Sequence, residues 1–335
     1  MGTERARPLA LEKVIWAESF GEEEQRARSL WDLDIPLSFF RTPLQNIPEN
    51  EFIPNTGVAI RTHSRLPDTL KQKLVCVLTR STGFDHIGEE YSNLPVGYLP
   101  DYATQAVAEY NLMMALGLLR CLPDSMDAIQ RFERSGLTGN ELATTEIGIV
   151  GVGRIGKATA ELLAPQVKSI RGYDVKPDSQ WAKSVGLKYV ELEALFRQSK
   201  IVFLCLPMNS STEFLIDSAL LHCLSNGSYL VNSGRGEVVR NQDLLSALEE
   251  GPLGGIALDV YNRESELREY LSEKNSRNSL PEEVHAARKL LEHPRVMATP
   301  HNAFNTQESL EKKVKRTLRS LRAFQNTGTF PFPVR

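Results

Sequence analysis

A glycine-rich turn near the middle of the chain lies between a short apolar run and an amphipathic segment. The turn reads Gly151-x-Gly153-x-x-Gly156, and a second apolar run further on ends at Asp174. A helix that begins at such a turn presents free N–H groups to a diphosphate, and a downstream acid can accept hydrogen bonds from ribose hydroxyls. Because Asp174 would repel a 2′-phosphate, we expect NAD, with Lys176 keeping NADP open. The structural alternative is a turn that binds no ligand.

Three later segments place ionisable side chains directly after apolar, strand-like runs. Arg235 follows one such run, Asp259 and then Glu264 follow the next, and His301 follows the last. Ligands of open parallel sheets bind at the carboxyl ends of the strands, so these residues are candidates for one site. Each also has a structural alternative: a loop salt bridge for Arg235, a solvated charge for Glu264 and a capping role for His301.

Taken together, these side chains suit hydride transfer to a carbonyl group that lies beside a carboxylate. A guanidinium can hold the substrate carboxylate in a fork, and an imidazole can donate or accept the proton. The carboxylate of Glu264 can orient the imidazole of His301 and favour its charged form.

The elements that must position these residues alternate between strand-like and helix-like segments, which favours parallel sheets covered on both faces. We expect strands at residues 14–16, 37–40, 57–61, 74–78, 147–150, 167–173, 187–190, 201–206, 228–232, 255–260 and 296–299. We expect helices at residues 22–33, 67–74, 101–120, 281–291 and 306–324, with a charged, irregular segment from residue 262. The helix at 101–120 is apolar nearly all round, which predicts burial, in part at a subunit contact. The basic residues of 306–324, Lys313 among them, are expected on a solvated face.

The fold class predicted from this order is α/β, with two doubly wound parallel-sheet domains of the Rossmann or flavodoxin type, one inserted in the other. Residues 101–301 would form the NAD-binding Rossmann domain. Residues 1–100 together with 302–335 would form the substrate-binding, catalytic domain.

The composition gives no sign of a nucleic-acid or membrane partner. Of the 335 residues 41% are hydrophobic, and a net charge of −3 provides no electrostatic case for nucleic acid. No apolar stretch is long enough to span a bilayer, and the first residues lack the apolar core of a signal peptide. The scattered cysteines have no zinc-like spacing, so we expect no metal site and reduced, buried thiols in a cytoplasmic protein. They are Cys76, Cys121, Cys205 and Cys223.

Several blocks, in one order, are similar to those of the D-isomer-specific 2-hydroxy acid dehydrogenases, and the resemblance covers nearly the whole chain. The matching blocks are the glycine turn and residues 81–87, 102–109, 232–236, 254–260 and 299–301. A tyrosine at position 102 resembles the D-lactate dehydrogenase branch. Two features depart from the family pattern. Ser265 follows Glu264 where the family often has a proline shortly afterwards, and the charged segment 265–292 matches poorly.

The resemblance implies roles for individual residues in substrate binding and catalysis. Arg235 would bind the substrate carboxylate and carbonyl, and His301 would be the acid/base, held by Glu264. Backbone amides of Thr82 and Gly83 would bind the carboxylate from the smaller domain, and Tyr102 would lie near the substrate.

The resemblance also implies the cofactor contacts and the assembly. The residues expected to contact NAD are Gly151, Gly153, Arg154, Ile155, Gly156, Asp174, Pro207, Gly234 and Asp259. Among them, Asp259 would contact the nicotinamide amide and Pro207 would line the cofactor cleft. A homodimer built largely by the nucleotide-binding domain would be the assembled form.

We therefore predict an NAD-dependent oxidoreductase that interconverts a 2-keto acid and a D-2-hydroxy acid. Two alternatives stay open at this point. One is the oxidation of a phosphorus oxyacid or a phosphorylated hydroxy acid on the same scaffold. The other is an NAD-sensing, corepressor-like binding module without catalysis.

Overall fold

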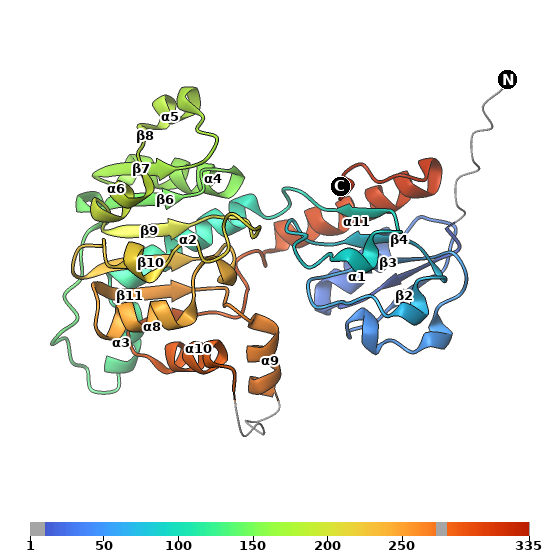
Figure 1. Ribbon diagram of the computed structural model, residues 1–335, viewed down its shortest axis with the longest axis horizontal. Helices are drawn as coiled ribbons and strands as arrows, with labels where there is room; N and C mark the ends of the chain where they lie inside the picture. Colours follow the sequence, from blue (N-terminus) through green and yellow to red (C-terminus); the bar gives the residue numbers. More distant parts are fainter. Residues whose placement is uncertain (1–10, 273–279, 335) are drawn as a thin grey trace. The chain divides into compact units, whose positions relative to one another are not determined.

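The computed structural model describes residues 11–272 and 280–334, which divide into two compact units (Figure 1). The first unit combines both ends of the chain, Met1–Tyr102 and Asn305–Arg335, and the second is Ala103–Phe304. Each unit contains a parallel sheet, which confirms the predicted α/β class. Residues 1–10, on which the expectation of no signal peptide rests, lie outside the described residues.

The sheet of the first unit has the strand order β2-β1-β3-β4-β5, and each neighbouring pair is parallel. This is the order of flavodoxin-like, doubly wound sheets. The strands are β1 Lys13–Trp16, β2 Leu37–Phe39, β3 Thr56–Ile60, β4 Leu74–Thr79 and β5 Val96–Tyr98. The short edge strand β5 was not expected from the sequence.

Two helices pack together against one face of this sheet. They are α1 (Gly21–Leu30) and α11 (Gln307–Thr327), and Val314 of α11 lies in one buried cluster with Trp16 of β1 and Ala59 of β3. In a second cluster, loops and 3₁₀ turns pack against residues of the strands. The turns are η1 Leu44–Asn46, η2 Glu49–Glu51, η3 Asp68–Leu70 and η4 Glu89–Tyr91.

The prediction of a helix at residues 67–74 was wrong. The chain there forms only the turn η3, and Lys73 already donates its backbone N–H to Leu70 before β4 begins at Leu74. The few residues between Pro67 and β4 allow little helix propagation after the unfavourable first turn.

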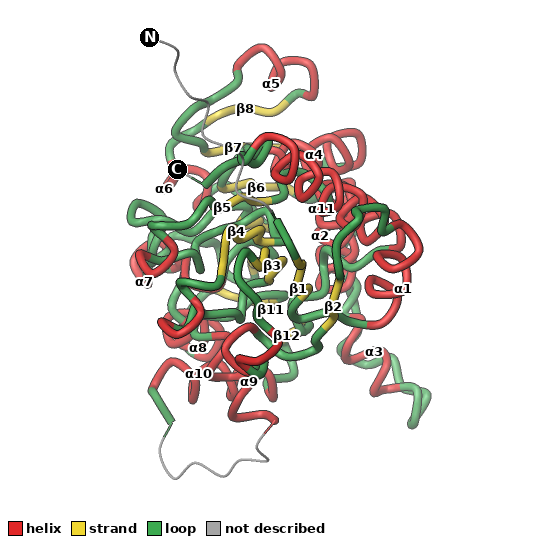
Figure 2. The backbone as a smooth tube through the Cα atoms, turned by 90° about the vertical axis from the view of Figure 1, so that its right-hand side faces the viewer, coloured by secondary structure: helices red, strands yellow, loops and turns green. Residues whose placement is uncertain are grey.

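The sheet of the second unit has the order β12-β11-β10-β9-β6-β7-β8, again with parallel neighbours. Read from its other edge, this is the Rossmann order with one strand added, and the order reverses between β6 and β9. The strands are β6 Glu146–Val150, β7 Ser169–Tyr173, β8 Leu187–Tyr189, β9 Ile201–Leu204, β10 Ser228–Asn232, β11 Leu253–Leu258 and β12 Val296–Ala298. Strand β8 forms the end of the sheet beyond β7, together with α5 (Ser179–Val185) (Figure 2).

Helices cover both faces of this sheet, because its central strands are apolar on both sides. In β9, Ile201 and Phe203 join the core of α2 (Thr104–Leu119) and α4 (Arg154–Leu163), whereas Val202 and Leu204 join the opposite core. The helices of the opposite core are α6 Leu192–Arg197, α7 Ser218–Leu221, α8 Asn241–Glu249 and α10 Glu282–Glu292. A short helix, α3 (Leu122–Ala128), follows α2.

The segment from residue 262 was expected to be irregular, and this was wrong for its first part. Helix α9 (Glu264–Ser272) forms there, and its residues Leu267 and Tyr270 are buried in the core of α8 and α10. Most of its other residues are charged, so the local composition does not indicate a helix. Residues 273–279, where the expected irregular segment continues, lie outside the described residues.

The cysteines carry free thiols. Only Cys76 is buried, and the expectation of buried thiols was wrong for Cys121, Cys205 and Cys223, which are half-buried. None of the helices in the described ranges is both long and apolar enough to cross a membrane.

A buried group of charges ties β4 of the first unit to its two helices. Arg80 directly after β4 donates to the Glu23 carboxylate of α1 at 2.5 Å, and Lys313 Nζ of α11 lies 3.1 Å from the same oxygen. All three side chains are fully buried, so Lys313 does not lie on the solvated face expected for it. Burial alone would raise the pKa of Glu23, but the positive charges of Arg80, Lys313 and Arg61 outweigh burial and hold the pKa at about 2.

We expect Glu23→Gln to destabilise the protein by about 3–5 kcal/mol, the usual effect of removing one partner of a buried ion pair. Arg80 and Lys313 would then be buried without their carboxylate. Chemical denaturation measures the change, and the control Glu22→Gln, at an exposed position of α1, should change stability by less than about 0.5 kcal/mol.

The pH dependence of stability follows from the direction in which the pKa of Glu23 is shifted. The pKa of Glu23 lies below its ordinary value of 4.5, so its contribution to stability is present above pH 4.5 and is lost as the pH falls toward 2. The difference between wild type and Glu23→Gln should therefore shrink in acid. A constant difference between about pH 7 and pH 3.5 would contradict this account.

Candidate active site

The candidate residues of the second unit lie on loops that leave the same edge of its sheet. Because the strands are parallel, the segments that follow β6, β7, β9, β10, β11 and β12 emerge at their common carboxyl edge. These segments contain the glycine turn, Asp174, Pro207, Arg235, Asp259 and His301. The structure thus brings the predicted cofactor and catalytic segments of this unit to one edge.

The glycine turn has the backbone geometry that a bound diphosphate requires. Gly151 has φ +88°, and a Cβ added there would meet the Cys205 carbonyl oxygen at 2.7 Å. A Cβ at Gly156 would meet the Gly151 carbonyl oxygen at 2.1 Å, whereas a Cβ at Gly153 would meet nothing within 4 Å. Gly153, at the N-cap of α4, therefore leaves open space beside the first turn of the helix, where Arg154 and Ile155 lie.

The Asp174 carboxylate lies beside this turn. One of its oxygens accepts the backbone N–H of Val152 at 2.8 Å, and the other accepts the backbone N–H of Lys176 at 2.8 Å. The side chain is half-buried after β7. These bonds hold a carboxylate next to the glycine turn, where the ribose of a dinucleotide would lie.

The Arg235 loop is held by the last residue of β10. The fully buried Asn232 accepts the backbone N–H of Gly234 at 3.1 Å and donates its side-chain amide to the Arg235 carbonyl at 3.0 Å. A Cβ on Gly236 would collide with the backbone of Tyr261 at 1.9 Å, so the loop after β10 packs directly on the loop after β11. The half-buried Arg235 side chain donates to the Gly234 carbonyl at 2.9 Å.

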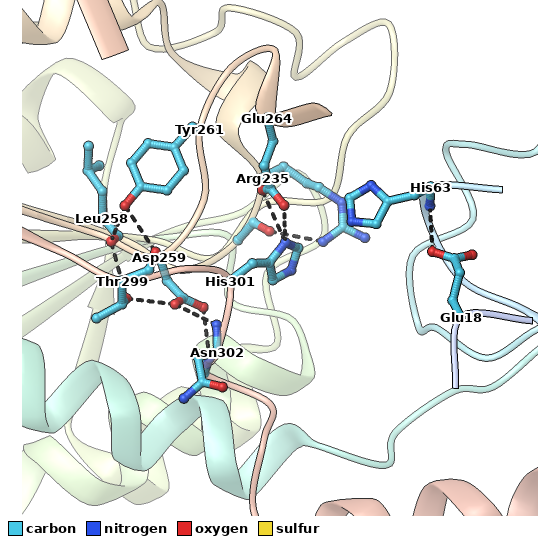
Figure 3. A network of polar contacts seen from close by, with 12 residues as sticks. Glu18, His63, Arg235, Leu258, Asp259, Tyr261, Glu264, Thr299, His301 and Asn302 are labelled. Carbon is cyan, nitrogen blue, oxygen red and sulfur yellow. Dashed lines mark hydrogen bonds and ion pairs between the residues drawn. The ribbon is translucent and has the colours of Figure 1, made fainter. Parts of the chain in front are cut away.

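His301 and Glu264 form a pair. His301 Nδ1 lies 3.0 Å and 3.1 Å from the two oxygens of the Glu264 carboxylate (Figure 3). Both side chains are partly exposed, at 34% and 27%. A carboxylate in this position sets the orientation and the tautomer of the ring.

Asp259 fixes the backbone on both sides of His301 (Figure 3). Its fully buried carboxylate accepts Thr299 Oγ1 at 2.7 Å, the backbone N–H of Asn302 at 2.7 Å and that of Ala303 at 2.8 Å. Asp259 therefore holds the backbone of the loop that contains His301. The contact of Asp259 with the nicotinamide amide, which the family resemblance implies, stays a prediction. The carboxylate that would make this contact already accepts hydrogen bonds from the protein.

Glu264 is positioned by contacts that local sequence patterns do not predict. The Glu283 carboxylate of α10 accepts the Asn241 backbone N–H at 2.8 Å and the Asn262 side-chain amide at 2.9 Å. Asn241 in turn donates to the Asn262 carbonyl at 3.0 Å. These bonds hold the chain just before Glu264, while Leu267 anchors α9 in the core.

Left-handed backbone occurs at His301 and directly before Glu264. His301 has φ +53°, and Arg263, directly before Glu264, has φ +58°. Non-glycine residues rarely adopt this conformation, and it recurs at functional sites where surrounding contacts impose it.

Thr82, Gly83 and Tyr102 belong to the first unit. There the Ser81 hydroxyl donates to the Gly83 carbonyl at 2.7 Å, and Thr82 Oγ1 donates to the Leu99 carbonyl at 3.1 Å. Tyr102 is buried, with Lys313 Nζ 5.8 Å from its ring centre. Their contacts with the substrate stay predictions. In the described parts of both units, no group of three or more metal-ligating side chains is close enough to hold a metal ion.

A fold of this topology, with a glycine-rich turn and a paired histidine and glutamate at the sheet edge, is that of a nicotinamide-dependent dehydrogenase. A family model described as D-isomer specific 2-hydroxyacid dehydrogenase, NAD binding domain, matches residues 112–303. The D-lactate dehydrogenase of Treponema pallidum (strain Nichols) is 31% identical over 252 residues, which cover 73% of this chain and 74% of that protein. A D-specific alpha-keto acid dehydrogenase of Enterococcus faecium is 31% identical over 255 residues, covering 74% and 75%.

The similarity extends to solved structures. The D-lactate dehydrogenase from Aquifex aeolicus, complexed with NAD and lactic acid, superposes with a TM-score of 0.82 at 27% identity. The match covers 95% of this chain and 98% of that one.

The chain belongs to the D-isomer specific 2-hydroxyacid dehydrogenase family. It is an NAD-dependent oxidoreductase that interconverts a 2-keto acid and a D-2-hydroxy acid. The family, the fold class and the cofactor predicted from the sequence are confirmed. The phosphorus-oxyacid, phosphorylated-acid and corepressor-like alternatives are not favoured, because the relatives are keto-acid and hydroxy-acid dehydrogenases.

We expect Glu264→Gln to lower kcat for keto-acid reduction, because an amide would hold the His301 ring less firmly than a carboxylate whose two oxygens both contact Nδ1. Steady-state kinetics with a saturating 2-keto acid measure the change. As a control, Glu266→Gln, which removes an exposed ion pair with Arg263, the residue directly before the same helix, should keep the wild-type kcat. A wild-type kcat in Glu264→Gln would remove the carboxylate from this role.

Proposed function

We propose that His301 is the acid/base of this dehydrogenase and that Glu264 holds it in place. The observation that carries the proposal is the 3.0 Å contact between His301 Nδ1 and the Glu264 carboxylate. An imidazole bound through Nδ1 presents Nε2 for proton transfer, and the carboxylate sets its tautomer. Protonated His301 would donate to the oxygen of the keto group during reduction, and neutral His301 would take the proton back during oxidation.

Arg235 would bind the substrate through its guanidinium fork. A fork can engage the carboxylate and the neighbouring carbonyl oxygen at once, and it stabilises the charge that develops on that oxygen. The backbone bonds of Asn232 support this role, since they hold the Arg235 loop at the carboxyl edge of the sheet. Arg235 would thus bind and orient the substrate, while His301 moves the proton.

The chain's own residues fit a dinucleotide at the glycine turn. The open space at Gly153, the start of α4 and the Asp174 carboxylate suit a diphosphate and a ribose, with Pro207 and Gly234 as further contacts. NADH, when bound, supplies the hydride. We propose that residues 101–301 form the cofactor-binding domain on this basis.

We propose that the first unit, residues 1–100 with 302–335, supplies the remaining substrate contacts. The hydrogen bonds at Ser81 and Thr82 hold the loop whose backbone amides, at Thr82 and Gly83, would bind the carboxylate. Tyr102 would lie near the bound acid. A crystal structure with NADH and oxamate, the amide analogue of a 2-keto acid, tests these contacts; oxamate bound without them would contradict the assignment.

The names of the relatives suggest a small substrate. Several are D-lactate dehydrogenases and two are D-specific alpha-keto acid dehydrogenases. We propose that this chain reduces pyruvate to D-lactate, with larger 2-keto acids as further substrates. NADH oxidation with a panel of 2-keto acids, followed by chiral analysis of the product, tests this; an L-product or no turnover would contradict it.

We expect His301→Ala to lower kcat for 2-keto acid reduction by roughly 10²–10⁴-fold, the usual contribution of general acid–base catalysis. NADH binding, measured by fluorescence titration, should change little, because the glycine turn is not altered. The control His293→Ala concerns a half-buried histidine before β12, at the opposite end of the strand that leads to His301, and should keep wild-type turnover. If His301→Ala turns over at close to the wild-type rate, the acid/base is another residue.

We propose further that the protein is a homodimer formed through α2, α3 and the segment after α3. Large apolar side chains gather there in exposed positions, including Met126 at 68% and Phe132 at 83% exposure. The full set is Met113, Leu116, Leu122, Met126, Ile129 and Phe132. An exposed apolar surface of this kind is typical of a protein contact, and a second copy of the chain is its proposed occupant.

We expect the double substitution Met126→Glu and Phe132→Glu to convert the dimer to a monomer, because two buried charges would be left in an apolar contact. Sedimentation velocity measures the change. The control Ile53→Glu, at an exposed apolar residue of the first unit, should leave the dimer intact. A wild-type protein that is monomeric at micromolar concentration would contradict the proposal.

A cytoplasmic location is proposed as well, supported by the free thiols of the cysteines. Fractionation of cells that produce the protein tests it, and recovery outside the cytoplasm would contradict it.

A further inference from the structure

A buried asparagine, Asn111, lies in the middle of the otherwise apolar helix α2. Its residue exposure is 1%, and its neighbours in the helix contribute apolar side chains to the core. Burying an amide without hydrogen bonds is unfavourable, so a side chain of this kind needs partners on both its oxygen and its nitrogen.

The partners of Asn111 come from three other segments. Its Oδ1 accepts the Ser233 hydroxyl at 2.6 Å, and its Nδ2 donates to Thr159 Oγ1 at 3.1 Å. The same Nδ2 lies 3.8 Å from Cys205 Sγ. Thr159 is fully buried and Ser233 nearly so. The two ends of one amide therefore contact two different parts of the site.

Each partner adjoins a segment with a proposed function. Ser233 lies between Asn232 and Gly234, in the turn that holds Arg235. Thr159 lies in α4, the helix that begins at the glycine turn. Cys205 follows β9, and its carbonyl oxygen is the atom that packs against Gly151. The amide of Asn111 thus links the cofactor helix with the loop of the substrate-binding arginine.

The geometry of an amide makes this link directional. Its oxygen and nitrogen belong to one rigid planar group, so a rotation that follows Thr159 also moves the oxygen relative to Ser233. A dinucleotide that fixes the start of α4 would fix this rotation, and with it the Ser233 turn.

We propose that Asn111 is a positioning residue that couples the two ligands, so that bound NADH holds the Arg235 loop ready for the 2-keto acid. The inference rests on the proposed function of Arg235 and the glycine turn. By linkage, the keto acid must strengthen NADH binding by the same factor as NADH strengthens binding of the keto acid. The coupling can therefore be measured from NADH affinity alone.

The test measures the dissociation constant of NADH by fluorescence, without oxamate and with saturating oxamate. In wild type, oxamate should tighten NADH binding. In Ser233→Ala and in Thr159→Val, which remove one hydroxyl each and keep the side-chain shape, this tightening should fall by about 5-fold or more, the lower range of coupling between sites. NADH affinity without oxamate should stay within about twofold. Asn111→Leu should give the same result.

A double substitution shows whether the effects pass through one residue. If both hydroxyls act through the Asn111 amide, Ser233→Ala combined with Thr159→Val should lose no more coupling than either alone. The matched control is Ser228→Ala, a buried serine at the opposite end of the same strand β10, whose hydroxyl bonds the Ser199 carbonyl. It should keep the wild-type coupling.

The outcomes separate this inference from the proposed function. Wild-type coupling that persists in Ser233→Ala and Thr159→Val would overturn the role of Asn111 and leave the proposed function intact. Effects that add in the double variant, or an equal loss in Ser228→Ala, would also overturn it. A wild-type enzyme whose NADH affinity does not respond to oxamate would overturn the coupling, and failure of that enzyme to reduce any 2-keto acid would overturn the proposed function itself.

Discussion

The active edge of the second unit depends on one constraint, the parallel pairing of the strands in its sheet. Parallel strands send their carboxyl ends to one edge, so segments far apart in sequence meet without any special contact between them. Arg235 follows β10, Asp259 follows β11 and His301 follows β12, three neighbours in the sheet. The glycine turn follows β6, where the strand order reverses. The segments proposed for catalysis and for cofactor binding share an edge for this reason.

The same constraint explains how much the sequence could predict. Strands buried on both faces read as continuous apolar runs, and the residue after each run lies at the edge, so the positions of Arg235, Asp259 and His301 could be predicted before their contacts were known. What the sequence did not predict depends on contacts between distant residues. The bond from Glu283 to Asn241 joins positions on two helices with no common local pattern. Helix α9 was missed because charged residues surround its few apolar ones.

The first unit shows a second limit of prediction from sequence, because no local pattern in a single sequence indicates that a charged residue is buried. Lys313 stands among basic residues of α11 and reads as solvent-exposed, yet it is buried against Glu23. Only the nearby carboxylate of Glu23 makes this burial tolerable, because an unpaired ammonium in the interior is strongly unfavourable. The loops and 3₁₀ turns that contribute to one buried cluster of the same unit were also hard to predict, because such turns show no periodic pattern of apolar residues.

The contact between His301 and Glu264 depends on a backbone that local preferences oppose. The left-handed conformations at His301 and Arg263 are each unfavourable by about 1–3 kcal/mol. Such a conformation persists only where surrounding contacts impose it. At His301 they are the three hydrogen bonds of the buried Asp259 carboxylate, and before Glu264 they are the bonds of Glu283 and the packing of α9. A relaxed backbone would separate imidazole and carboxylate, so these contacts hold the two groups 3.0 Å apart. Placement of an imidazole beside a carboxylate, rather than added stability, is the physical reason for this part of the structure.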